Sequence, residues 1–116
     1  MSGEGAGGER IWVTGLGAIT ALGGDLEATW TRLLAGERGL SNADLFDTTG
    51  QRATLVAQVR APVPEPAGDV AWSRTALLAL AAAREALAWA KLDPGAARVG
   101  VIVGGTTGGK IGRAHV

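Results

Sequence analysis

The chain carries the stretch IWVTGLG at residues 11–17, and this stretch decides the first element of the fold. Its first four residues are β-branched or aromatic, and a Gly-Leu-Gly turn follows them directly. A short apolar run that ends at glycines is typical of a buried strand. We therefore predict a strand over residues 11–14 that runs into a tight turn.

The rest of the chain alternates between helix and strand patterns. Asp25 or Gly24 can cap a first helix, Gly36 is placed to end it, and Ser73 can cap a second, longer helix. In chain order we expect a helix over 26–34, a strand over 52–59, a proline-rich connector over 62–66, a helix over 74–91 and a strand over 99–103. The expected core side chains are Trp30, Leu33, Leu34, Leu77, Leu80 and Leu87. This order predicts an α/β protein.

Composition excludes several classes of function. Lys plus Arg and Asp plus Glu number 11 each, so no overall field attracts nucleic acid or an anionic membrane. The absence of cysteine excludes a disulfide, a zinc–thiolate site and a thiol nucleophile in this chain. The longest apolar run, residues 76–83, is far short of the ~18 residues of a membrane span. We expect a cytoplasmic protein without metal or cofactor.

Two glycine loops resemble nucleotide-binding motifs. Gly15 and Gly17 could open a dinucleotide-binding turn, but the third glycine position of that motif is Thr20, and no acidic residue closes a second strand. We expect instead a turn in which backbone passes close to backbone. Residues 104–110 fit the phosphate-loop pattern GxxxxGK, but Ile111 stands where a magnesium-binding hydroxyl is needed. A small phosphate-loop protein is therefore kept as an alternative.

The end of the chain has its own explanation. Residues 111–116 show no periodicity, and they can be encoded by ATC GGA AGA GCA CAC GTC, which matches the opening of a common short-read sequencing adapter. The codon of Lys110 overlaps the junction. His115, the only histidine, then carries no functional argument. We expect a flexible N-terminus over 1–10, an incomplete domain over 11–109 and a non-native tail over 110–116.

Between about Arg10 and Gly109 the sequence resembles the β-ketoacyl-acyl-carrier-protein synthases. Three stretches in order carry the resemblance: WVTGLGAIT at 12–20 with Leu22-Gly23, Trp30 with LLAG at 33–36 and Gly39, and Arg74 with ALAAAREAL at 79–87 followed by RVGVIVG at 98–104. Two departures are Ala21, where members often have proline, and Trp89-Ala90-Lys91, where Asp-Ala-Gly is more usual.

The resemblance implies the first part of the N-terminal half of a five-layer thiolase-like fold, usually found as a homodimer. It also implies an acyltransferase of fatty-acid or polyketide biosynthesis. In this family a cysteine takes an acyl chain from acyl carrier protein. Two histidines then assist decarboxylation of the malonyl group and stabilise the enolate and the oxyanion. None of these three residues maps onto this chain, so we expect the chain itself to be inactive.

One site residue can be carried over from the family, and two alternatives stay open. Thr107 matches the position that borders the acyl pocket in chain-elongating members, although it could equally be a turn residue. Arg74 and Arg84 lie on an otherwise apolar helix, where arginines more often have a structural role than a functional one. Besides a truncated enzyme, the chain could come from a non-catalytic partner subunit of the chain-length-factor type, which lacks the cysteine naturally.

Overall fold

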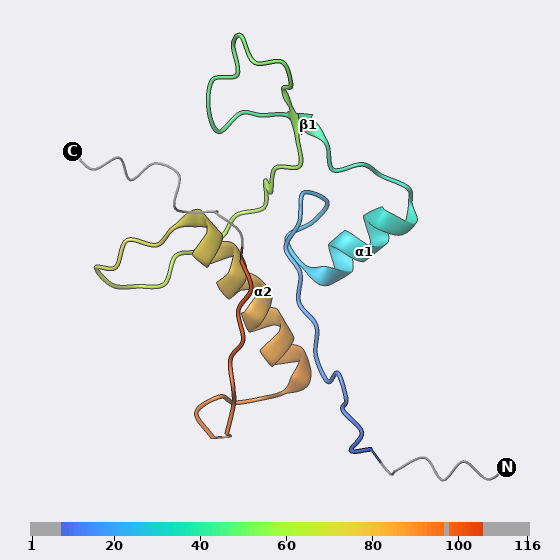
Figure 1. Ribbon diagram of the computed structural model, residues 1–116, viewed down its shortest axis with the longest axis vertical. Helices are drawn as coiled ribbons and strands as arrows, with labels where there is room; N and C mark the ends of the chain where they lie inside the picture. The colour runs from blue at the N-terminus through green and yellow to red at the C-terminus, as the bar shows by residue number, and fades with distance from the viewer. Residues whose placement is uncertain (1–7, 97, 106–116) are drawn as a thin grey trace, which may run out of the picture.

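The computed structural model describes residues 8–96 and 98–105. Helices and strands follow one another in the order α1, β1, β2, α2 (Figure 1). Their bounds are Leu26–Leu34 for α1, Ser41–Asn42 for β1, Leu55–Val56 for β2 and Arg74–Ala90 for α2. The described chain is therefore a small assembly of helix and strand, in which the two helices are the longest elements.

Both helices begin at the predicted caps. The Asp25 carboxylate accepts a hydrogen bond from the Ala28 N–H at 2.7 Å, and the Ser73 hydroxyl accepts one from the Ala76 N–H at 3.2 Å. Each cap satisfies a backbone donor that has no partner inside its helix. The starts of α1 and α2 are thus set by local chemistry that the sequence alone reveals.

Both helices also end in the same way, with one left-handed residue. Gly36 has φ of 73° after α1, and Lys91 has φ of 52° after α2. The paired bonds of a Schellman motif close each end: Glu37 N to Arg32 O and Gly36 N to Leu33 O in α1, and Leu92 N to Leu87 O and Lys91 N to Ala88 O in α2. The predicted role of Gly36 is confirmed, whereas Lys91 takes a conformation that favours glycine.

The two strands form a short antiparallel pair. Ser41 lies opposite Val56, and Asn42 lies opposite Leu55. The strand predicted over 52–59 is therefore confirmed only at Leu55–Val56. A strand extends only as far as a partner satisfies its backbone groups, and β1 supplies two residues.

The other two predicted strands are wrong for the described structure. Residues 11–14 and 99–103 carry no regular secondary structure, and neither belongs to a sheet. Ile11 is 94% exposed and Ile102 is fully exposed. An apolar sequence favours a strand, but a strand forms only where neighbouring strands complete the hydrogen-bonded ladder. Among residues 8–96 and 98–105, no segment offers that ladder to either stretch.

The core is correspondingly small. Leu77 is the one buried hydrophobic residue in the part of the chain that the structure describes. Leu80 and Leu87 are half-buried, and the predicted burial of Trp30, Leu33 and Leu34 is wrong because nothing described covers their face of α1. The Cα radius of gyration is 19.1 Å, against about 13 Å for a compact domain of this length. Neither α1 nor α2 is long and apolar enough to cross a membrane.

Candidate functional site

The glycine turn after residue 14 lies directly on the backbone of α2. A Cβ atom added at Gly17 would come closer than 3.0 Å to the Ala82 carbonyl oxygen and to the Ala86 amide nitrogen. A Cβ atom at Gly15 would meet Ala86 and Ala90 in the same way. These three alanines are spaced four residues apart, so they line one face of the helix. The predicted close passage of backbone against backbone is confirmed.

This packing leaves no room for the alternative of a dinucleotide-binding turn. Such a turn needs its glycines free to approach a pyrophosphate. Here Gly15 and Gly17 face the alanine stripe of α2 instead. Thr20, at the third motif position, bonds the Thr29 hydroxyl at 3.0 Å and accepts from the Leu22 N–H at 3.0 Å. The turn therefore serves to join the N-terminal segment to both helices.

Glu85 of α2 holds the same junction together. Its Oε2 accepts a hydrogen bond from the Ala18 N–H at 2.8 Å, and its Oε1 accepts one from the Leu26 N–H at 2.9 Å. Leu26 is the first residue of α1, where a helix has unpaired amides and favours negative charge. One half-buried carboxylate thus ties the glycine turn and the start of α1 to α2.

Sequence reasoning missed Glu85. The available signal was a single acidic side chain in the middle of an alanine- and leucine-rich helix, directly before Ala86 of the stripe that receives the glycines. A carboxylate in such a place needs hydrogen-bond donors. Backbone amides can supply them, but an amide donor cannot be recognised in a sequence by its residue type. Which amides it would reach could not be read from the chain, because they lie 67 and 59 residues away.

An apolar groove opens beside this junction. It has a volume of about 770 Å³ and lies between α1 and α2. Trp30 and Trp89 contribute the largest side chains, and they are 57% and 58% exposed. The residues lining the groove are Leu16, Leu26, Glu27, Trp30, Glu85, Ala88 and Trp89. With both oxygens of Glu85 bonded to backbone, the groove presents mainly apolar surface.

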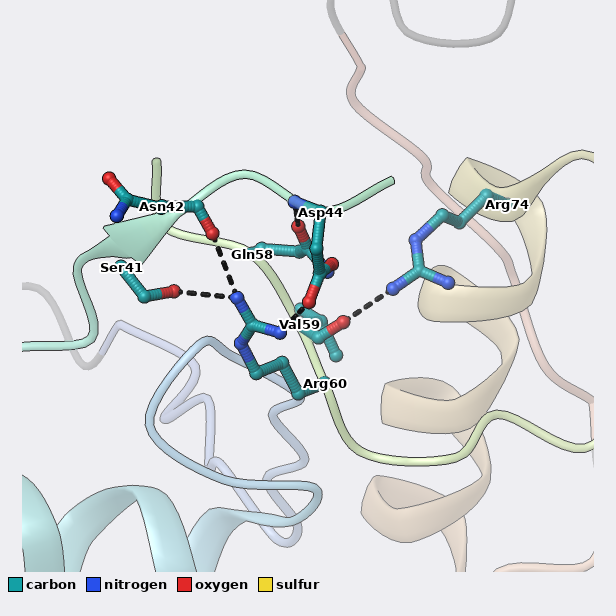
Figure 2. A network of polar contacts seen from close by, with 7 residues as sticks. All are labelled: Ser41, Asn42, Asp44, Gln58, Val59, Arg60 and Arg74. Carbon is teal, nitrogen blue, oxygen red and sulfur yellow. Dashed lines mark hydrogen bonds and ion pairs between the residues drawn. The ribbon is translucent and has the colours of Figure 1, made fainter. Parts of the chain in front are cut away.

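A second cluster of polar residues joins the two arms of the β1–β2 hairpin (Figure 2). The Arg60 guanidinium donates to the Asp44 carboxylate, to the Ser41 hydroxyl at 2.9 Å and to the Asn42 carbonyl at 3.0 Å. The Gln58 amide donates to Asp44 as well. Hydrogen bonds from Gln58 and then from Arg60 lower the pKa of Asp44 below its usual value. The cluster is a structural tie across the hairpin.

The two arginines on α2 differ in what they contact. Arg74 donates to the Val59 carbonyl (Figure 2), so it links the start of α2 to the strand region. Arg84 is exposed, and its side chain makes no hydrogen bond within the described ranges. The Asp47 carboxylate accepts hydrogen bonds from the Thr49 hydroxyl at 2.7 Å and from the Thr49 N–H at 2.9 Å, and these bonds lower the pKa of Asp47.

A cleft of about 520 Å³ lined by three arginines is another candidate for a binding site. Arg32 forms an ion pair with Glu37 at 2.6 Å and donates to the Leu22 carbonyl, and Arg60 is committed to Asp44. Of the three, Arg38 alone has no ion-pair partner among the described residues. Two of the three arginine charges in the cleft are therefore already paired with carboxylates.

Residues 8–96 and 98–105 include no cysteine and no histidine. Condensation chemistry of the expected kind needs a nucleophile beside a base and oxyanion donors. The chain has no cysteine, and its one histidine, His115, lies outside the described residues. Thr107, the predicted acyl-pocket residue, also lies outside them, as do most of the phosphate-loop motif and the tail. No metal-binding group of acidic, histidine or cysteine side chains occurs within 8–96 and 98–105.

Comparison with known proteins identifies the family. The model of the β-ketoacyl synthase N-terminal domain matches residues 8–115. The 3-oxoacyl-[acyl-carrier-protein] synthase 2 of Staphylococcus aureus strain COL is 32% identical over 108 residues, which are 87% of this chain and 26% of the relative. The ketoacyl synthase alpha subunit of the tetracenomycin polyketide synthase of Streptomyces glaucescens is 32% identical over 107 residues, 86% of this chain and 25% of the relative.

A shorter match has higher identity. The 3-oxoacyl-[acyl-carrier-protein] synthase 2 of Vibrio cholerae serotype O1 is 45% identical over 40 residues, 34% of this chain and 10% of the relative. No solved structure matches the chain. The chain spans about a quarter of the length of the S. aureus and S. glaucescens relatives. By its sequence from residue 8 to residue 115, this chain belongs to the β-ketoacyl synthase family.

Proposed function

We propose that this chain is the amino-terminal part of a β-ketoacyl-acyl-carrier-protein synthase, and that the whole protein condenses an acyl chain with malonyl-acyl carrier protein. The family match and the two relatives of fatty-acid and polyketide type support this reading. In the reaction, the bond between the malonyl C2 and its carboxylate breaks and carbon dioxide leaves. C2 then bonds to the acyl carbonyl carbon, and a cysteine thiolate is released.

The observation that supports placing the catalytic groups in the rest of the parent protein is the absence of cysteine from all 116 residues of this chain. The acyl transfer needs a thiolate, and the enolate and oxyanion need preorganised donors. Those groups would come from the part of the parent protein that this chain does not include. We propose that the chain alone is inactive, and that Thr107 borders the acyl pocket once the parent fold is complete.

In the parent protein, the described residues form part of the structural framework and hold the N-terminal segment and α1 against α2. Gly15 and Gly17 let the N-terminal segment lie on α2, and Glu85 fixes the start of α1 against it. The complete protein would have the five-layer thiolase-like architecture, act as a homodimer and take its substrates from acyl carrier protein. Because the two relatives compared over most of the chain are named as synthases, we assign the catalytic subunit rather than a non-catalytic partner.

The test compares two polypeptides with the same amino-terminal sequence. The purified 116-residue chain is incubated with acyl- and malonyl-acyl carrier protein, and ketoacyl product and carbon dioxide are measured by mass spectrometry. A polypeptide that continues from residue 109 through the rest of the gene is tested beside it. We expect product only from the longer polypeptide, and none after its cysteine is replaced by alanine. Ketoacyl product from the 116-residue chain would refute the proposal.

A further inference from the structure

We draw no further inference here: the strongest candidate, the apolar groove between α1 and α2 that Trp30 and Trp89 line, carries nothing, because its cover by the rest of a β-ketoacyl synthase fold restates an established property of the family.

Discussion

Gly17→Ala should detach the N-terminal segment from α2. The new Cβ atom would lie closer than 3.0 Å to two backbone atoms of the helix, and helix backbone cannot move aside without breaking its own hydrogen bonds. The turn must therefore retreat until the gap reaches the 3.4 Å of ordinary contact. The retreat needed is well over 1 Å, which takes the 2.8 Å bond between the Ala18 N–H and Glu85 beyond the ~3.2 Å limit of a hydrogen bond.

The magnitude follows from the bond that is lost. A hydrogen bond to a charged acceptor contributes about 1.5–3 kcal/mol, and forced overpacking costs about 1–3 kcal/mol. The lower end of the hydrogen-bond range alone gives a loss of roughly 1.5 kcal/mol, and tenfold in an equilibrium constant corresponds to about 1.4 kcal/mol. We expect the amide hydrogen exchange of Ala18 to accelerate by a factor of about ten to one hundred.

Millisecond-labelling hydrogen exchange, read by mass spectrometry on peptides that cover residues 11–26, measures this change. Gly100→Ala is the control, since a Cβ atom there meets nothing within 4 Å. Glu85→Ala should reproduce the loss of protection at Ala18 without altering the glycine. If Gly17→Ala exchanges like the unaltered chain, the reasoning from the close approach to α2 is refuted.

Three further predictions concern other parts of the chain. Lys91→Gly should stabilise the end of α2 by roughly 0.5–1 kcal/mol, because Lys91 has φ of 52°, and the helical circular-dichroism signal should then persist to higher temperature. An equal gain from Lys91→Ala would contradict this cause. In an NMR titration the pKa of Asp44 should lie below the usual 3.8 of an aspartate, because hydrogen bonds from Gln58 and Arg60 stabilise its charged form. The contact with Arg60 therefore persists above about pH 4 and is lost as the pH falls through the lowered pKa, and an unshifted titration would refute the contact. The isolated chain should bind hydrophobic dyes strongly and melt without a sharp transition, since Leu77 is its one buried hydrophobic residue among those described; a cooperative calorimetric transition with dispersed amide signals would show a self-sufficient domain.

The helices could be predicted from sequence because their determinants are local. Asp25 and Ser73 cap the helix starts through amides three residues away, and Gly36 supplies the left-handed residue after α1. The periodicity that marks each helix lies within the helix itself. Such signals do not depend on the rest of the fold, so they hold even where little else is packed.

The strands and the junction could not be predicted in the same way. Residues 11–14 and 99–103 have strand-type sequences, but a strand is completed by partners that no local pattern supplies. The exposure of Trp30 has the same origin. The sequence places Trp30 on the apolar face of α1, but whether another element packs against that face depends on the rest of the fold. Glu85 depends on amides 67 and 59 residues away, which periodicity does not reveal.

A single continuous sequencing read across the gene tests most directly whether this chain is the amino-terminal part of a longer condensing enzyme. We predict that the reading frame continues beyond Lys110 with residues other than Ile111–Val116, enters a glycine-containing turn and a further helix, and later encodes a cysteine. A read that returns the same six codons followed by a stop codon would contradict this prediction.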